Sequence, residues 1–257
     1  MRVLQQAIRC VLKKSEMFFG KRILAVVPAR GGSKSIPGKN LQKIAGHSLL
    51  GHAALFTKKL KWLDASILST DCEEIAKEGR KYNLAVPFMR PAALSTDNAP
   101  SVEMWKHAWI QAEESLQTKF DISILLEPTS PCRIVDDVET TVMTLINDGA
   151  PAVVTLSKTP AHYTPQKTLT ISPSGNVSFY LGAKLGDKYS IRQRIPCYYH
   201  RNGICYAVTR QQLINKGKIF GSGVKGVVIR RNVVNIDDQY ELKVADWLME
   251  NTNHVKT

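Results

Sequence analysis

Short apolar runs alternate with stretches of helical periodicity over much of the chain. The apolar runs cover residues 23–27, 66–69, 85–88, 122–126 and 152–156. Each has the length of a buried strand and ends in polar or turn-forming residues. The stretches between them, at 49–60, 73–82, 102–116 and 135–146, predict helices. This alternation predicts an α/β fold, with a Rossmann-like, mostly parallel sheet flanked by helices.

The alternation stops after residue 156 and returns only near the end of the chain. Residues 157–200 are polar and rich in proline and glycine, whereas 203–208 and 233–236 predict strands and 240–249 predicts a helix. A long insertion in a compact domain is usually functional or an interaction arm. We therefore expect one domain over residues 21–257, with an inserted arm at about 157–200.

The first twenty residues form a separate segment by pattern. They carry four basic residues against one acidic residue, with apolar positions at roughly helical spacing. An amphipathic helix that touches a membrane or a partner and a frayed start of the chain both fit this pattern. Because the first strand begins near Arg22, we expect residues 1–20 to be a dispensable extension.

Composition narrows the classes of partner. With 35 Lys and Arg against 22 Asp and Glu, the formal charge is +13, which attracts nucleic acid, acidic lipid or a triphosphate. No basic stripe interleaved with aromatic residues points to nucleic acid.

No apolar stretch approaches the roughly 20 residues of a membrane span, and no leader pattern is present, so we expect a cytoplasmic protein. The five cysteines include no CxxC pair, which argues against zinc and against a disulfide framework.

A phosphate-binding loop is predicted directly after the first strand. The sequence PARGGSKSIPGKN occupies residues 28–40. Small residues let backbone N–H groups, such as that of Gly31, approach an anion closely, and Arg30, Lys34 and Lys39 can neutralise a triphosphate. The spacing matches neither GxxxxGK[ST] nor GxGxxG, which excludes the P-loop and dinucleotide-binding motifs. In contrast, Asp71 followed by Glu74 indicates a capping box for the helix at 73–82.

The loop and a series of later motifs resemble the CMP-sialic acid synthetases, or acylneuraminate cytidylyltransferases. The later matches are LLGH at 49–52, STD at 69–71, RP at 90–91 followed by Asp97 and Ser101, LLEPTSPCR at 125–133, RQRIP at 192–196, NGICY at 202–206 and NIDD at 235–238. The resemblance covers about residues 22–250. It implies a nucleotidyltransferase fold and an enzyme that couples CTP to a nine-carbon 2-keto acid sugar with release of pyrophosphate.

The resemblance also implies a nucleotide site. Arg30, Ser33, Lys34 and Lys39 match the residues that bind the triphosphate, and Asn40 matches the position beside the α-phosphate. The other positions that line the nucleotide pocket would be Ala29, Gly31, Arg90 and Ser101. Two of these have an ordinary alternative, because Arg90 fits a surface arginine before Pro91 and Ser101 fits a cap for the following helix.

Sugar-binding residues follow from the same resemblance. They are Glu127, Ser130, Arg192, Gln193 and Tyr206. Arg192 is the better candidate for the sugar carboxylate, because a guanidinium pairs with it bidentately. The family often has glutamine at the position of Glu127, and a family arginine aligns with His200, next to Arg201.

A magnesium site is expected at NIDD. Relatives often carry Asp-Ile-Asp here, and along a strand the two outer side chains point to the same side. We expect Asp237 to bind Mg²⁺ through its carboxylate, with Asn235 offering a neutral oxygen and Asp238 capping the last helix. The catalytic set would then be Arg30, Lys39, Asn40 and Asp237.

The function has alternatives, and an assembly is implied. The acidic sugar could instead be legionaminic acid, pseudaminic acid, Kdn or Kdo. A catalytically impaired nucleotide-binding relative is the alternative from another class, because Asn235 stands where relatives commonly have aspartate. The arm at 157–200 matches the dimerisation arm of relatives, so a homodimer is expected.

Overall fold

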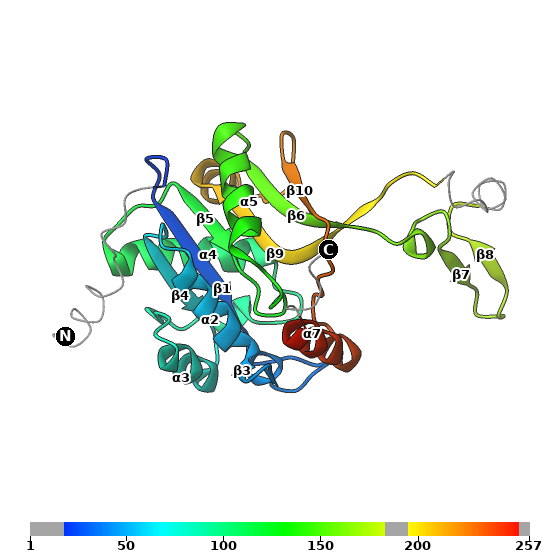
Figure 1. The fold of residues 1–257 in the computed structure, drawn as a ribbon, viewed down its shortest axis with the longest axis horizontal. Coiled ribbons are helices and arrows are strands. Elements are labelled where there is room, and N and C mark those ends of the chain that lie inside the picture. The colour runs from blue at the N-terminus through cyan, green and yellow to red at the C-terminus, as the bar shows by residue number, and fades with distance from the viewer. Residues whose placement is uncertain (1–17, 183–194, 252–257) are drawn as a thin grey trace.

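A six-stranded sheet forms the centre of the protein in the computed structural model, which describes residues 18–182 and 195–251 (Figure 1). In spatial order its strands are β10 (Lys225–Ile229), β6 (Ala152–Lys158), β9 (Tyr199–Thr209), β5 (Ile122–Leu125), β1 (Ile23–Pro28) and β4 (Ala65–Ser69). Only β9 runs antiparallel to its two neighbours, β5 and β6. The other adjacent strands are parallel, which confirms a mostly parallel sheet.

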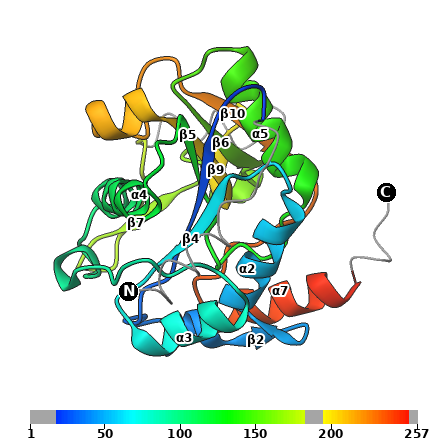
Figure 2. The ribbon, with the colours of Figure 1, turned by 90° about the vertical axis from the view of Figure 1, so that its left-hand side faces the viewer.

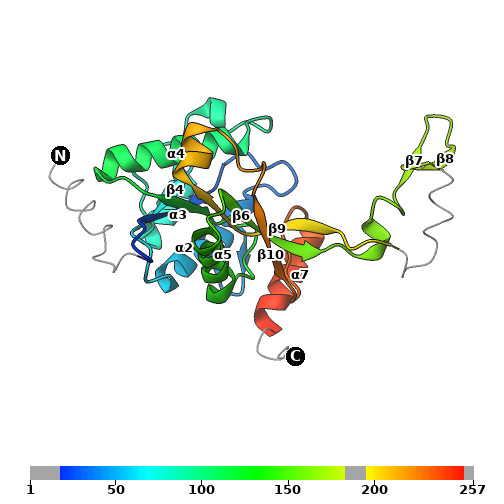
Figure 3. The same ribbon diagram turned by 90° about the horizontal axis from the view of Figure 1, so that it is seen from above.

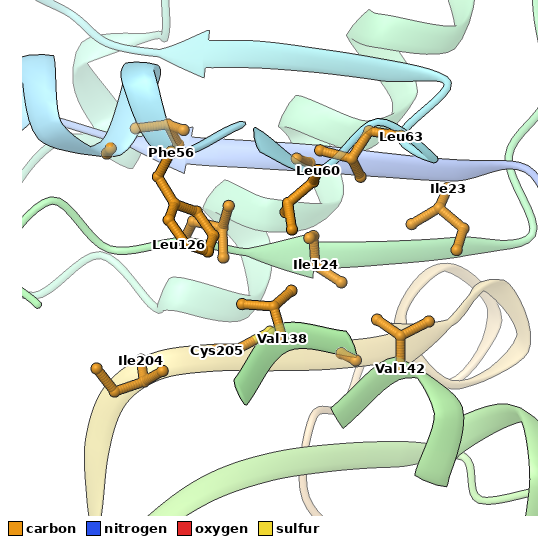
Figure 4. Close-up of a cluster of buried hydrophobic side chains, with 14 of the residues drawn as sticks. Ile23, Phe56, Leu60, Leu63, Ile124, Leu126, Val138, Val142, Ile204 and Cys205 are labelled. Carbon is orange, nitrogen blue, oxygen red and sulfur yellow. The ribbon is translucent and has the colours of Figure 1, made fainter. Parts of the chain in front are cut away.

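Helices cover both faces of this sheet (Figure 2). Helices α2 (Leu49–Lys59) and α5 (Val135–Asn147) lie on one face, and α4 (Ser101–Leu116) lies on the other. Along β1, Ile23 and Val27 belong to the apolar cluster of α2 and α5, whereas Leu24 packs with α4. Figure 4 shows the first cluster, with Phe56 of α2 and Val138 of α5 beside the strands. Burial on both faces explains why these strands are continuous apolar runs rather than alternating ones.

The remaining elements complete the body of the protein. Helix α3 (Glu73–Lys81) follows β4, and α7 (Gln239–Asn251) contacts the small hairpin of β2 (Lys43–Ile44) and β3 (His47–Ser48). Short helical turns η1 (Lys39–Leu41), η2 (Ala92–Leu94) and the π-helix η5 (Gln211–Asn215) join the larger elements. No helix in the described part of the chain is both long and apolar enough to cross a membrane.

Two predicted strands are wrong. Of residues 85–88, only Ala85 forms a bridge, with Ile67 of β4, because Pro87 has no N–H to continue a ladder. Residues 233–236 are not a strand either, since their contacts go to the turn after β5: the Ile236 N–H donates to the Thr129 carbonyl at 2.8 Å. Strand β10, which the apolar pattern did not indicate, takes the edge position beside β6.

Asp71 does not cap α3. The N-cap residue is Cys72, without a side-chain hydrogen bond, and the Asp71 carboxylate instead accepts the Gly31 N–H at 3.0 Å. The predicted capping box at this helix is therefore wrong. Asp71 is used by the loop after β1 because the two loops leave adjacent parallel strands at the same edge of the sheet.

The inserted segment projects from the sheet as an arm (Figures 1 and 3). Its described parts are η3 (Ala161–Tyr163) and the antiparallel hairpin of β7 (Leu169–Ile171) and β8 (Val177–Phe179). Within the described part of the chain, apolar side chains of this hairpin remain exposed: Ile171 is 73% exposed and Val177 is 60% exposed.

Phe18, which lies within the predicted N-terminal extension, contacts the folded body. Residues 1–17 lie outside the described part of the chain. Phe18, however, packs against the core, and its ring stacks on Trp62 with centroids 4.7 Å apart. The folded body therefore includes Phe18, and dispensability of the preceding residues stays a prediction.

Candidate active site

The predicted phosphate loop lies at the carboxyl edge of the sheet, where it follows β1. Its start is fixed by the Ala29 N–H, which donates to the Ser69 carbonyl of β4 at 3.0 Å. Across the loop, the Asn40 side-chain amide donates to the Arg30 carbonyl at 3.0 Å. Asn40 is buried, whereas Ser33 is half-buried. The second bond holds the two ends of the loop together, and the first attaches the loop to β4.

Each of the three predicted loop cations has a carboxylate partner. Arg30 and Lys34 both bind Asp97, with N to O distances of 2.7 and 2.6 Å. The Lys39 ammonium lies 3.4 Å from an Asp237 carboxylate oxygen and donates to the Ile236 carbonyl at 3.0 Å. The structure therefore brings the loop and the NIDD segment together, although they are nearly 200 residues apart in sequence.

The structure excludes the ordinary alternatives for Arg90 and Ser101, which were a surface arginine and a helix cap. Arg90 is buried, not on the surface, and donates to the Ser69 hydroxyl at 3.0 Å and to the Ser69 carbonyl. Burial lowers the pKa of Arg90 to about 10, so it remains charged at neutral pH. Ser101 is an exposed first residue of α4, whose N-cap is Pro100, so Ser101 is not a cap. Arg90 fixes the end of β4 beside the phosphate loop.

The predicted sugar side is built by the turn after β5 and by β9. The Ser130 hydroxyl lies 3.0 Å from both the Asn202 carbonyl and the Asn235 side-chain oxygen. Gly203 has a φ of +70°, and a Cβ there would lie 2.7 Å from a Glu127 carboxylate oxygen and still closer to the Ser130 hydroxyl. Glycine is required at 203, because only a residue without a side chain lets β9 approach Glu127 and Ser130 this closely.

Tyr206 lies on β9, paired with Leu125 of β5, and its ring is buried. Burial raises the pKa of Tyr206, and the nearby Glu127 carboxylate raises it further, so the phenol is neutral. The last two predicted sugar residues, Arg192 and Gln193, lie outside the described residues.

Sequence reasoning gave no role to several residues at this edge. Arg133 is buried and donates to the Ile204 carbonyl at 3.1 Å and to the Glu127 carbonyl, so it holds the turn against β9. Arg201, on β9, is close enough to Glu127 to lower its pKa. Arg133 ends the LLEPTSPCR motif at 125–133, but its contacts with Ile204 and Glu127 depend on the packing of β9 against the turn after β5. Arg201 was noted only as a neighbour of the aligned position His200.

The Glu127 carboxyl group titrates in an unusual range. Burial raises its pKa to about 7, against the opposing effect of Arg133 and Arg201. A raised carboxyl pKa means that the folded state retains a proton that the unfolded state has lost. The contribution of Glu127 to stability is therefore greatest below its ordinary pKa of 4.5 and falls as pH rises to about 7.

Glu127→Gln is expected to remove this pH dependence, because glutamine is nearly isosteric and stays neutral. Relative to the unchanged protein, its Tm should rise by about 2–4 °C on going from pH 5 to pH 8, which corresponds to roughly 1 kcal/mol after allowance for solvent screening. Thermal unfolding at both pH values, in EDTA, measures this. A Tm difference between the two proteins that is the same at pH 5 and pH 8 would contradict the assignment.

The residues expected to bind magnesium offer hard oxygen ligands, but few of them. Asp237 has a largely exposed carboxylate, and the Asn235 oxygen has a free lone pair after it accepts the Ser130 hydroxyl. Among the described residues, no group of three or more His, Cys, Asp or Glu is placed to hold a metal ion. One carboxylate and one amide oxygen fit an Mg²⁺ ion that takes its other ligands from substrate phosphates and water.

Asp238 has the structural role that the sequence indicates. Its carboxylate accepts the Glu241 N–H at 2.8 Å, and the Glu241 carboxylate accepts the backbone N–H groups of Asp237 and Asp238 at 2.6 and 3.3 Å. This is a reciprocal cap at the start of α7. The cap fixes the backbone of Asp237 and leaves its carboxylate directed to Lys39.

A predicted phosphate loop with three cations, placed at the carboxyl edge of a mostly parallel sheet and facing an acidic segment, is typical of a nucleotidyltransferase of the α/β class. The family model described as "Cytidylyltransferase" matches residues 24–169, so the chain belongs to the cytidylyltransferase family. The family predicted from the motifs is confirmed at this level, and the protein is an enzyme of the nucleotidyltransferase type.

Curated relatives extend this similarity over most of the chain. Post-translational flagellin modification protein B of Campylobacter coli is 28% identical over 90% of this chain and 96% of its own length. CMP-N,N'-diacetyllegionaminic acid synthase of Legionella pneumophila is 28% identical over 89% of this chain and 97% of its own length. N-acylneuraminate cytidylyltransferase of Escherichia coli is 27% identical over 91% of this chain and 54% of its own length.

A solved structure confirms the fold. A CMP:2-keto-3-deoxy-manno-octonic acid synthetase in complex with CTP superposes with a TM-score of 0.65, at 18% sequence identity, and covers 90% of this chain and 99% of the other.

Proposed function

We propose that this protein couples CTP to an acidic nonulosonic sugar, an N-acylneuraminate or a related nine-carbon 2-keto acid, to form the CMP-sugar and pyrophosphate. The observation that carries the proposal is the meeting of two clusters at one edge of the sheet. The cations of the phosphate loop contact the NIDD segment through Lys39, and Asn235 of that segment contacts Ser130 of the sugar side. A nucleotide on the loop therefore places its α-phosphate beside the sugar side.

The chemistry requires positioning and charge stabilisation. The anomeric hydroxyl of the sugar gives its proton to water and attacks the α-phosphorus. A new O–P bond forms, and the bond from the α-phosphorus to the oxygen that bridges the α- and β-phosphates breaks, so that pyrophosphate leaves. Arg30, Lys34 and Lys39 bind the leaving phosphates, and Asn40, beside the α-phosphate, donates to its oxygens. When bound, Mg²⁺ supplies further neutralisation of phosphate charge, with Asp237 and Asn235 as its protein ligands.

The sugar would lie against the turn after β5. Ser130, Glu127 and Tyr206 offer a hydroxyl, a carboxyl group and a phenol to sugar hydroxyl and acylamino groups. A protonated Glu127 also avoids repulsion of the sugar carboxylate, which is consistent with its raised pKa. Arg192 and Gln193 complete the predicted set. The names of the relatives support this class of sugar, because they include a legionaminate, a pseudaminate and an N-acylneuraminate enzyme.

Pyrophosphate release from CTP, with a panel of acidic sugars, tests the proposal. The panel contains N-acetylneuraminic, legionaminic, pseudaminic, Kdn and Kdo acids, and the control lacks sugar. Release that depends on both CTP and one of the nine-carbon acids supports the proposal. Release with Kdo alone would indicate the eight-carbon alternative, and binding of CTP without release for any sugar would indicate a catalytically impaired relative.

A cytoplasmic location is part of this proposal. It is supported by the cysteines of the described residues, Cys72, Cys132, Cys197 and Cys205, which are all free thiols.

A homodimer through the arm is also proposed. Its support is the apolar surface of the β7–β8 hairpin, which includes Ile171 and Val177 and is left exposed by the part of the chain that the structure describes. A monomer rarely exposes such a contiguous apolar surface.

Charges introduced on this hairpin are expected to break the dimer. In sedimentation velocity, the unchanged protein should sediment at twice the chain mass of 28.6 kDa, whereas the double variant Ile171→Asp, Val177→Asp should sediment as a monomer. Ser174→Asp, at the polar tip between the two strands, is the matched control and should remain a dimer. A monomeric unchanged protein, or a dimeric double variant, would contradict the proposal.

A further inference from the structure

Asp97 binds two of the three cations of the phosphate loop. It lies in the loop between η2 and α4, and its two carboxylate oxygens contact different cations: one is 2.7 Å from Arg30 and the other is 2.6 Å from Lys34. The carbonyl of Ser95, in the same loop, also accepts a hydrogen bond from Arg30 at 3.4 Å. Asp97 thus takes the bridging arrangement that two oxygens of a phosphate group would take.

The charge of Asp97 is secure. The hydrogen bonds from Lys34 and Arg30 hold the pKa of Asp97 below its ordinary value, so the carboxylate is ionised at neutral pH. Its side chain is 39% exposed, and that of Lys34 is 86% exposed. Ion pairs this exposed are individually weak and exchange readily with a competing anion.

We propose that Asp97 is an internal competitor of the substrate phosphates, which lowers the affinity of the loop for pyrophosphate enough for this product to leave. The proposal rests on the proposed function, because it takes Arg30 and Lys34 as ligands of the β- and γ-phosphates. Any ligand that uses these two cations must first displace the Asp97 carboxylate. The cost is the same for CTP and for pyrophosphate.

The consequence differs for the two ligands. CTP has additional contacts through its base, ribose and α-phosphate and keeps useful affinity in spite of the competition. Pyrophosphate is held only through its phosphate groups, so competition at Arg30 and Lys34 acts on most of its binding. Asp97 therefore determines how strongly the product inhibits the enzyme.

Removal of the carboxylate gives a directional test. Isothermal titration of the full-length chain with pyrophosphate, CTP and CMP, at one magnesium concentration, compares the unchanged protein with Asp97→Asn. We expect the Kd of pyrophosphate and that of CTP each to fall by about fivefold to tenfold, the scale of two exposed ion pairs. The Kd of CMP, which lacks the β- and γ-phosphates, should change by less than about twofold.

A matched control excludes a general effect of charge. Asp148→Asn removes the same charge from a surface ion pair with Lys225, whose N to O distance is 2.8 Å and whose aspartate is 41% exposed. This variant should leave all three dissociation constants unchanged. Thermal unfolding verifies the fold of each variant, and Asp97→Ala replaces Asp97→Asn if the latter unfolds.

The outcomes separate this inference from the proposed function. If Asp97→Asn binds pyrophosphate equally well or more weakly, while Lys34→Ala also weakens binding, Asp97 orients the cations rather than competes with phosphate, and the inference is overturned. If neither Arg30→Ala nor Lys34→Ala weakens pyrophosphate or CTP binding, the loop is not the anion site, and the proposed function itself fails.

Discussion

Arg30→Ala and Lys39→Ala are each expected to lower kcat/KM for CTP by about 10²-fold or more, the scale found when one preorganised charge-stabilising group is removed. Both cations come from the loop after β1, and each donates to a backbone carbonyl: Arg30 to Ser95, and Lys39 to Ile236 of the NIDD segment. Lys39 is also the less exposed of the two, with only 11% of its side chain accessible. A fixed, largely buried ammonium stabilises developing charge without reorganisation.

The measurement is steady-state pyrophosphate release over a range of CTP concentrations. Lys225→Ala serves as the control, because it removes a lysine from an exposed ion pair on the edge strand β10, away from the loop. That variant should retain nearly full activity. Folded Arg30→Ala and Lys39→Ala proteins with kcat/KM within about threefold of the unchanged enzyme would disprove the assignment of the loop.

Asp237→Ala is expected to abolish magnesium-dependent turnover while the fold remains intact. Asp237 is the one carboxylate of the pair at 235 and 237, and its backbone is fixed by the cap at the start of α7. Its carboxylate is 76% exposed, so little packing is lost on truncation. Removal should therefore affect the metal and Lys39 rather than stability.

Binding of Mn²⁺ in the presence of CTP, followed by electron paramagnetic resonance, provides a readout that does not depend on turnover. Asp237→Ala should weaken the ternary complex, whereas Asn235→Asp should bind Mn²⁺ equally or more tightly, because it adds a second charged oxygen. Retention of most activity and of Mn²⁺ binding by Asp237→Ala would exclude this residue as the metal ligand.

The sequence by itself determined the class of the fold and singled out residues 28–40 as the predicted phosphate loop. Strands buried on both faces must be apolar throughout, so β1, β4, β5 and β6 were visible as short runs, and the amphipathic stretches between them gave the helices. The loop at 28–40 was visible because it concentrates glycine and basic residues within one segment. Local signals of this kind depend on neighbours in sequence.

The partners of the site residues were decided only by tertiary structure. Asp71 follows the capping rule by spacing, yet it binds Gly31, because β1 and β4 are adjacent and deliver their loops to one edge. Residues 233–236 have the composition of a strand, but they bind the turn after β5 instead of a sheet neighbour. Neither outcome is encoded in local spacing.

The same holds for the electrostatics of the site. Nothing near Asp97 in the sequence indicates that it bridges Arg30 and Lys34, because tertiary contacts bring its loop to residues 28–40: Arg90 binds the end of β4, and α4 packs on the sheet. The raised pKa of Glu127 likewise follows from burial beside Gly203 and β9. Residue types and local periodicity determine which groups are available, whereas burial and contacts between distant segments determine which of them meet and in which charge state.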